Sequence, residues 1–191
     1  MATETEAKFR IADHEPLRVR LTQLGATTGG QQVHTDIYFD TAEDRLRKSD
    51  TALRLRCSGQ TSVLTYKGPQ QKGRYKQRQE IETHVADPQA IESLLKQLGF
   101  TQSLLLEKSR QSWLLDSCRV ELDTLPLLGS FVEIEGPSEE DISRAIEQLR
   151  LGSGNSITTP YTTLIRAHLQ KTGNPTREIR LTEANLGRSK T

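Results

Sequence analysis

The sequence predicts an α+β fold in which about eight antiparallel β-strands carry charges on one face and helices cover the other. Charged residues recur at every second position in separate short segments, which places them on one face of a strand. Apolar residues alternate with them and form the opposite face. Other segments have leucine and isoleucine at helical spacing and supply the cover.

Length and charge restrict the possible functions. The 191 residues suit one domain, and 26 Lys and Arg against 25 Asp and Glu give a net charge of +1. This balance gives no reason to expect nucleic acid or an anionic membrane as a partner. No apolar run is long enough to span a bilayer, and we expect no secretory signal, because residues 1–4 lack a basic and apolar start. Cys57 and Cys118 form no disulfide framework, so we expect a cytoplasmic protein.

The first half of the chain begins with a strand in which Glu4, Glu6 and Lys8 share one face. A helix is predicted over 13–24, because leucines recur at helical spacing before Gly25. Further strands follow at residues 36–40, 52–56 and 63–67. Residues 41–50 are interpreted as a polar turn region, and Gly59 suits a hairpin.

The second half repeats this pattern. A basic loop over 68–77 carries Lys72, Arg74 and Lys76. These side chains either face solvent or, if the strands enclose a tunnel, lie at its mouth and attract anions. Strands are predicted at residues 78–82, 105–114, 119–125 and 131–135. Helices are predicted after the N-cap Asp87, after Ser138 and from about Pro160.

The sequence further suggests two related halves and a tail. Glu4-x-Glu6 and Glu80-x-Glu82 each precede a helix that ends in Leu-Gly, and alternating strands follow both. We therefore expect a pseudo-symmetric domain over 1–172. Residues 173–191 are polar and lack periodicity, and we interpret them as a C-terminal tail.

The charged faces permit two interpretations. In the first, an open sheet turns them toward water. In the second, the strands close around a lumen, where so many charges must be paired or bind ions. Separation by sign favours the lumen: one set is basic (Arg54, Arg56, Lys67, Arg78, Lys108, Arg110), and Glu4 with Glu6 and Glu133 with Glu135 are acidic pairs. A polyphosphate with a divalent metal would neutralise both sets.

The same residues resemble a known family. Glu4-x-Glu6-x-Lys8 is similar to the signature that opens CYTH proteins, the triphosphate tunnel metalloenzymes. Further matches follow in the family's order: Asp36-x-Tyr38-Phe39-Asp40, Leu53-Arg54-Leu55-Arg56, Leu64-Thr65-Tyr66-Lys67-Gly68-Pro69, Arg78-x-Glu80-x-Glu82, Glu107-Lys108-x-Arg110, Leu122-Asp123, Leu128-Gly129-x-Phe131-x-Glu133-Ile134-Glu135 and Tyr161-x-x-Leu164. The resemblance covers roughly residues 1–170 and is nearest in look to class IV adenylate cyclases.

The resemblance implies an eight-stranded antiparallel tunnel with helices packed outside it. It implies that Mg²⁺ or Mn²⁺ is bound by carboxylates: Glu4, Glu6, Asp123, Glu133 and Glu135. These acids and Lys8 are the expected catalytic residues. It also implies a triphosphate-binding set: Lys8, Arg54, Arg56, Lys67, Arg78, Lys108 and Arg110. Arg78 has a second interpretation, as internal salt-bridge structure with Glu80 and Glu82, and Tyr161 is expected to support the tunnel.

Three functions remain open at this point. The first is a cyclase that makes cyclic AMP and pyrophosphate from ATP. The second is a hydrolase of thiamine triphosphate or inorganic tripolyphosphate, and the third is a non-catalytic binder of polyphosphate or nucleotide. All three use the same charged lining, because preset cations stabilise negative charge on phosphate oxygens. Cyclases of this branch further suggest a homodimer.

Overall fold

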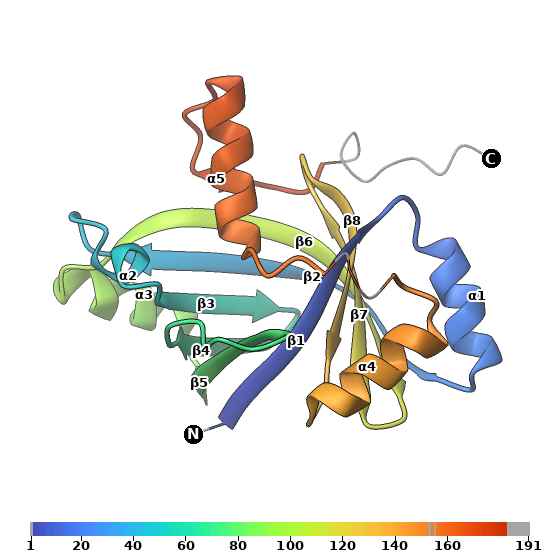
Figure 1. Ribbon diagram of the computed structural model, residues 1–191. Coiled ribbons are helices and arrows are strands. Elements are labelled where there is room, and N and C mark those ends of the chain that lie inside the picture. The colour runs from blue at the N-terminus through green and yellow to red at the C-terminus, as the bar shows by residue number, and fades with distance from the viewer. Residues whose placement is uncertain (1, 153, 155, 183–191) are drawn as a thin grey trace.

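Eight strands close into an antiparallel barrel (Figure 1). The computed structural model describes residues 2–152, 154 and 156–182. The barrel strands are β1 (Ala2–Ile11), β2 (Thr27–Asp40), β3 (Ala52–Ser58), β4 (Thr61–Lys67), β5 (Lys76–His84), β6 (Thr101–Leu115), β7 (Cys118–Leu125) and β8 (Gly129–Glu135). They pair in the order β2-β3-β4-β5-β1-β8-β7-β6, and β2 also pairs with β6, which closes the ring. The predicted eight-stranded α+β barrel is confirmed.

Helices lie outside the strands (Figure 1). They are α1 (Glu15–Gln23), α2 (Arg45–Lys48), α3 (Pro88–Gln97), α4 (Glu139–Gln148) and α5 (Tyr161–Thr172). The predicted caps of two helices are present: Asp87 Oδ1 accepts from Ala90 N at 3.0 Å, and Ser138 Oγ accepts from Asp141 N at 3.1 Å. No helix in the described part of the chain has the length and apolarity to cross a membrane.

Because strand residues alternate between two faces, the outward side chains of the barrel can pack against the helices. The outward residues Phe9 of β1 and Ile134 of β8 are buried with Ile142 of α4 and Leu21 of α1. Around the other side of the barrel, outward residues of β2, β3 and β6 pack against Leu95 of α3. Burial of these apolar side chains is the main favourable term that holds the helices on the barrel.

The helical cover is incomplete. Tyr66 of β4 and Ile81 of β5 lie opposite each other in the sheet register and remain 39% and 51% exposed. The expectation that helices shield the whole apolar face is therefore wrong at β4 and β5.

The strand order has the expected pseudo-symmetry. From β1 to β4 the order is a strand, a helix and three strands, with the short helix α2 between β2 and β3. From β5 to β8 the order repeats with α3 in place of α1 and without a counterpart of α2. Exchanging β1–β4 with β5–β8 reproduces the same ring of neighbours, with β1 beside β5 and β2 beside β6. The two halves therefore contribute equivalent walls to one lumen.

Part of the segment predicted as a tail packs on the barrel. Residues Glu178–Ile179 form β9, which pairs in parallel with Leu105 and Leu106 of β6. Ile179 is buried beneath α5, and Arg180 pairs with Glu107 at 2.9 Å. Two residues are too few to show a strand period in the sequence. The rest of the predicted tail, 183–191, lies outside the described residues.

Candidate active site

The lumen holds a cavity of about 730 Å³. All eight barrel strands contribute side chains to it, and α2 and α5 line one end. The lining includes eleven basic residues: Lys8, Arg47, Arg54, Arg56, Lys67, Lys76, Arg78, Lys108, Arg110, Arg119 and Arg166. It also includes nine acidic residues: Glu4, Glu6, Asp36, Asp40, Asp50, Glu80, Glu82, Glu133 and Glu135. The charged faces therefore enclose a cavity, and the open, solvated sheet is wrong.

A basic wall comes from β3 and β6. Arg56 donates two hydrogen bonds to Asp36, at 2.6 and 2.7 Å. Arg54 is buried and donates to Thr65 Oγ1 at 3.0 Å, while its Nε has no hydrogen-bond partner among the described atoms. A buried donor without a partner is unfavourable, and a phosphate oxygen would satisfy it.

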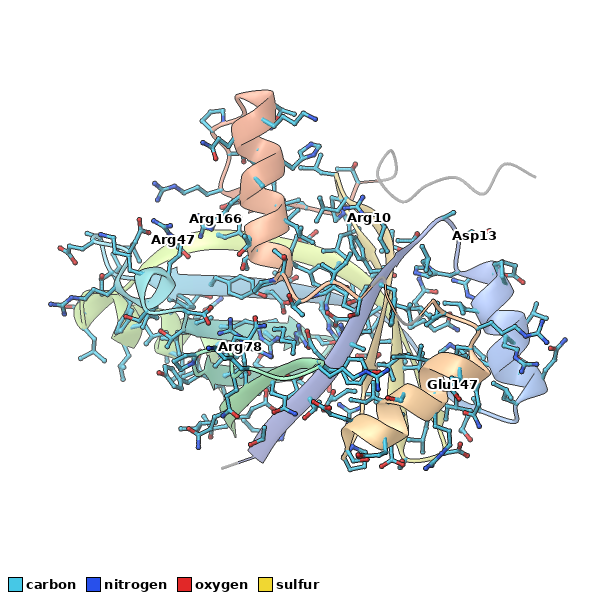
Figure 2. All side chains as sticks on the ribbon, viewed as in Figure 1. Arg10, Asp13, Arg47, Arg78, Glu147 and Arg166 are labelled. Carbon is cyan, nitrogen blue, oxygen red and sulfur yellow. The ribbon has the colours of Figure 1, made fainter. Side chains whose placement is uncertain are left out.

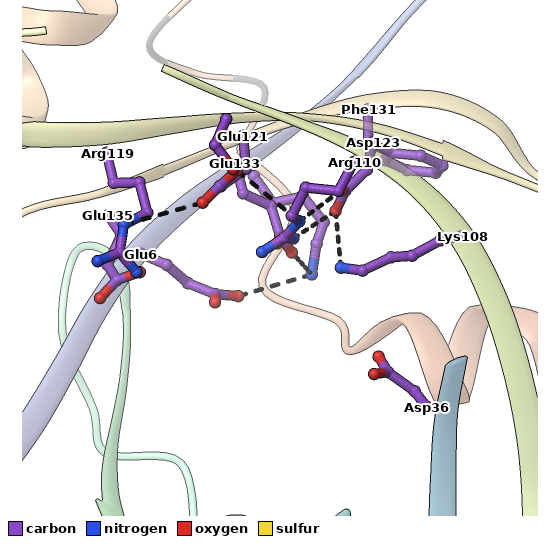
Figure 3. Close-up of polar contacts among 12 residues, drawn as sticks. Glu6, Asp36, Lys108, Arg110, Arg119, Glu121, Asp123, Phe131, Glu133 and Glu135 are labelled. Atoms are coloured by element: carbon purple, nitrogen blue, oxygen red, sulfur yellow. Dashed lines mark hydrogen bonds and ion pairs between the residues drawn. The ribbon is translucent and has the colours of Figure 1, made fainter. Parts of the chain in front are cut away.

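Asp123 lies behind this wall rather than in the cavity. It is fully buried and does not line the lumen. Its carboxylate accepts from Lys108 Nζ at 2.9 Å and from Arg110 Nε at 2.6 Å, as Figure 3 shows. The geometry makes Asp123 an anchor for two cations, and its expected role as a metal ligand stays a prediction.

The environment of Lys108 affects its charge. Burial lowers the pKa of Lys108, and the charge of Arg110 lowers it further, to about 8 despite the attraction of Asp123. Lys108 is therefore protonated at neutral pH but loses its charge in mildly alkaline solution.

An acidic wall comes from β1, β5 and β8. Lys76 Nζ lies 2.6 Å from Glu6 Oε1, and Lys67 Nζ lies 3.0 Å from Glu4 Oε2. Among the residues that the structure describes, the ion-pair partner of Glu135 is Arg119, at 3.7 Å. These contacts leave the carboxylates on this wall incompletely neutralised.

The pKa values show the same excess of acid. Burial raises the pKa of Glu135, and the charges of Glu4 and Glu6 raise it further. Burial and a hydrogen bond with Glu4 raise the pKa of Glu80 to about 8, so this pair keeps one proton at neutral pH. An added cation would relieve this crowding.

Glu133 lies between the two walls. It pairs with Lys8 at 3.4 Å and with Arg110 (Figure 3). Burial opposes ionisation, but the charges of Lys8, Lys108 and Arg110 dominate and hold the pKa of Glu133 well below its usual range. Glu133 is therefore a carboxylate at every pH of interest.

Tyr161 at the start of α5 positions two cations. Lys8 Nζ lies 4.3 Å from the Tyr161 ring centroid, and Lys108 Nζ lies 5.2 Å from it. Phe131 packs edge-on against the same ring, with centroids 5.1 Å apart. These contacts place the Tyr161 ring between Phe131 and two cations of the lumen, which is how Tyr161 would support the tunnel.

Eleven of the twelve predicted site residues line the cavity, and Asp123 is the exception. Arg78 lines it, but its guanidinium donates to Asp50 O at 2.6 Å, Gly68 O at 2.7 Å and Asp50 Oδ1 at 2.6 Å. Arg78 is therefore held by Asp50 and Gly68, and no hydrogen bond or ion pair with Glu80 or Glu82 is present among the described residues. Glu82 lies at the mouth, 3.6 Å from Arg54.

Four further cations line the cavity. Lys76 lies two residues before Arg78 on β5, so continuing the alternation by one step would have included it. Arg119 similarly alternates with Glu121 on β7. Arg47 and Arg166 lie on helices, where strand alternation provides no signal.

The acidic wall offers carboxylate oxygens that a divalent metal ion could bind. Within the described ranges, no three His, Cys, Asp or Glu side chains converge as metal ligands, because lysine and arginine partners hold the carboxylates. The donors are nevertheless carboxylate oxygens, which Mg²⁺ and Mn²⁺ prefer. The raised pKa of Glu135 beside Glu4 and Glu6 marks uncompensated negative charge. The chemistry of Glu4, Glu6 and Glu135 thus fits a divalent cation.

Solved structures share this fold. A structure from Vibrio parahaemolyticus, described as a "putative adenylate cyclase", has a TM-score of 0.76 at 18% identity and covers 85% of this chain and 97% of that one. A structure from Hippeastrum, described as a "putative adenylyl cyclase" with a dominant triphosphatase activity, has a TM-score of 0.67 at 18% identity, covering 86% and 95%. At these identities the likeness shows the fold alone.

Sequence comparison identifies the family. A protein of Methanocaldococcus jannaschii named "putative adenylate cyclase" is 31% identical over 132 residues, which cover 69% of this chain and 75% of that protein. The model of the CYTH domain matches residues 2–161, from β1 to the first residue of α5. The chain therefore belongs to the CYTH domain family.

Proposed function

We propose that this protein is a metal-dependent enzyme that acts on a triphosphate held in the lumen, most simply as an adenylate cyclase of the class IV type. The observation that carries the proposal is the enclosed cavity with a basic wall facing an acidic wall. Phosphate oxygens match the first wall, and a divalent cation matches the second. The name of the relative from Methanocaldococcus jannaschii supports the choice of cyclase.

The basic wall would bind the triphosphate. Arg54 has an unsatisfied donor, Arg56 presents a planar guanidinium, and Lys108 supplies a compact charge. Asp36 holds Arg56 and Asp123 holds Lys108 in place before any substrate arrives, so little reorganisation of these two cations is needed. Such pre-organised cations stabilise the negative charge that develops on phosphate oxygens during transfer.

The acidic wall would hold Mg²⁺ or Mn²⁺ through Glu4, Glu6 and Glu135. When bound, the ion would neutralise negative charge on the phosphate groups and orient the triphosphate. In the cyclase reaction the ribose 3′-hydroxyl oxygen bonds to the α-phosphorus, the bond to the pyrophosphate oxygen breaks, and the hydroxyl proton is released. The same lining serves a triphosphatase, in which water attacks the terminal phosphorus.

Hydrolysis of thiamine triphosphate or tripolyphosphate is the second candidate. The structure from Hippeastrum favours it, because its description combines this fold with triphosphatase activity. A non-catalytic polyphosphate binder is the third.

The described cysteines, Cys57 and Cys118, are free thiols, in keeping with the cytoplasmic location we propose. The homodimer remains a prediction.

A product assay tests the proposal. The protein is incubated with ATP, tripolyphosphate or thiamine triphosphate, with Mg²⁺, with Mn²⁺ or with a chelator, and products are resolved by chromatography and ³¹P NMR. Cyclic AMP and pyrophosphate in equal amounts, formed only with metal, are the expected result. Orthophosphate instead selects the triphosphatase. Tight metal-dependent binding without turnover selects the binder, and absence of binding refutes all three.

A further inference from the structure

Lys76 of β5 contacts the acidic wall at the carboxylate of Glu6. Its side chain is buried, with 7% of the residue exposed, and it lines the cavity. The Nζ atom lies 2.6 Å from Glu6 Oε1. Arg78, two residues further along β5, lines the same cavity and is labelled in Figure 2. Both side chains therefore lie on the lumen face of one strand, but their surroundings differ.

The contact of Lys76 competes with a divalent cation. Glu6 is one of the carboxylates that fit Mg²⁺ or Mn²⁺, and Mg²⁺ binds such oxygens at about 2.0–2.1 Å. An ammonium group hydrogen-bonded to the same carboxylate would repel the ion. Glu4 is held in a similar way by Lys67, at 3.0 Å. A metal ion can therefore bind this wall fully only if an ammonium group moves away from it.

Lys76 is held less firmly than its neighbours. Within the ranges that the structure describes, its side chain makes one hydrogen bond, to Glu6, although an ammonium group has three donors. Lys8 Nζ lies 3.7 Å from the same Glu6 oxygen, but it also donates to Thr159 O at 3.2 Å. The guanidinium of Arg78 makes three hydrogen bonds. Of these three cations, Lys76 has the fewest contacts to break.

A released Lys76 would need another anion. Its charge sits at the end of a flexible four-carbon side chain that already lines the cavity, so the group can turn within the lumen. A buried ammonium group without a partner is unfavourable. Phosphate oxygens of a ligand in the lumen would provide the partner. Binding of metal at Glu6 would thus favour binding of phosphate, and the reverse must hold to the same extent.

We propose that Lys76 is an exchangeable counter-ion of the acidic wall. A divalent cation displaces its ammonium group from Glu6, and the freed group then binds the triphosphate. The metal would in this way prepare a phosphate-binding group in addition to supplying its own charge. This inference rests on the proposed function, because it assumes that Glu6 binds the metal and that the lumen holds a triphosphate.

Nitrogen-15 NMR of the lysine ammonium groups tests the displacement directly. Wild-type protein is titrated with Mg²⁺ alone and then with tripolyphosphate, and the order parameter of each Nζ reports how firmly the group is held. The signal of Lys76 is identified by its absence in Lys76→Arg. We expect its order parameter to fall when Mg²⁺ binds and to rise again with tripolyphosphate. A nearby charge alone would shift the resonance without loosening the group.

Binding measurements on Lys76→Met test the coupling. Its Mn²⁺ affinity without phosphate, measured by electron paramagnetic resonance, should tighten about tenfold because the competing ammonium group is gone. Its tripolyphosphate affinity, measured by calorimetry, should fall about tenfold at saturating Mg²⁺ but at most about threefold with a chelator.

Lys72→Met is the matched control for these measurements. Lys72 lies in the adjacent loop, is exposed and does not line the cavity. The control removes the same charge, and both of its affinities should stay within about twofold of wild type. Thermal melting checks that each variant is folded, and the NMR titration of wild-type protein does not depend on the stability of Lys76→Met.

Three results would overturn the inference. If Mg²⁺ binds but leaves the order parameter of Lys76 unchanged, the ammonium group stays on Glu6. Equal weakening of tripolyphosphate binding with Mg²⁺ and with chelator would indicate long-range electrostatics alone. Unchanged or weaker Mn²⁺ binding in Lys76→Met would show that the two cations do not compete. In each case wild-type protein still binds metal and tripolyphosphate, so the proposed function stands. If wild-type protein binds neither, the proposed function fails and the inference fails with it.

Discussion

Replacing Asp123 by asparagine should destabilise the protein without removing a metal ligand. Asp123 is fully buried and is the described carboxylate partner of Lys108, and it also binds Arg110. Arg110 retains Glu133 in the variant, but Lys108 loses the carboxylate whose charge raises its pKa, so this buried side chain either stays charged without that partner or gives up its proton. Asparagine preserves the size of the side chain, so the change isolates the charge.

The magnitude follows from this burial. Removing one partner of a buried ion pair costs about 3–5 kcal/mol, and the retained amide oxygen places Asp123→Asn near the lower end. For a domain of this size about 3 kcal/mol corresponds to a fall in melting temperature of about 6–12 °C. Tripolyphosphate should restore part of the loss, because its oxygens replace the missing carboxylate beside Lys108.

Urea denaturation and thermal melting measure this effect, with and without tripolyphosphate. Asp116→Asn is the control: it removes the same charge from an exposed turn at φ 52°, a conformation that asparagine tolerates. Its stability should stay within about 0.5 kcal/mol of wild type. An Asp123→Asn variant as stable as wild type, but with lost Mn²⁺ affinity, would refute the reasoning and restore Asp123 as a metal ligand.

Three further predictions concern the cavity. Glu135→Ala should abolish metal-dependent turnover yet leave the melting temperature unchanged or higher, because burial and Glu4 already disfavour its charge; undiminished activity would remove Glu135 from the site. Arg54→Ala should weaken tripolyphosphate binding in calorimetry by about tenfold, and an unchanged Kd and kcat would show that Arg54 does not touch substrate. Tripolyphosphate affinity should fall as pH rises through about 8, because Lys108 loses a positive charge and Glu80 gains a negative one. Titrations at several pH values should show a smaller step in Lys108→Arg, and an identical step would exclude Lys108 as its source.

Alternation along the strands predicted the fold and most of the lining because a strand's period places side chains on faces. Glu4, Glu6 and Lys8 all reach the cavity for this reason. Alternation does not predict, however, whether a side chain on the lumen face reaches the cavity or is covered by its neighbours. Asp123 lies on the lumen face as predicted, but Lys108 and Arg110 cover it, and that arrangement depends on the pairing of β6 with β7.

Other features depend on contacts that are remote in sequence. Closure of the barrel requires β2 to pair with β6, for example His34 with Lys108, and no local pattern encodes that pairing. Arg47 reaches the cavity because Asp40 caps a four-residue helix in a segment interpreted as a turn. Such helices and the short strand β9 are too brief to produce a periodic signal.

The most direct test of the charged lumen is a crystal structure of the protein with a non-hydrolysable triphosphate and Mn²⁺, in which anomalous scattering locates the metal. We expect phosphate oxygens within hydrogen-bonding distance of Arg54, Arg56 and Lys108, and an anomalous peak beside Glu4, Glu6 and Glu135. Phosphate bound only on the outer surface, with an empty lumen and no metal on the acidic wall, would contradict the account.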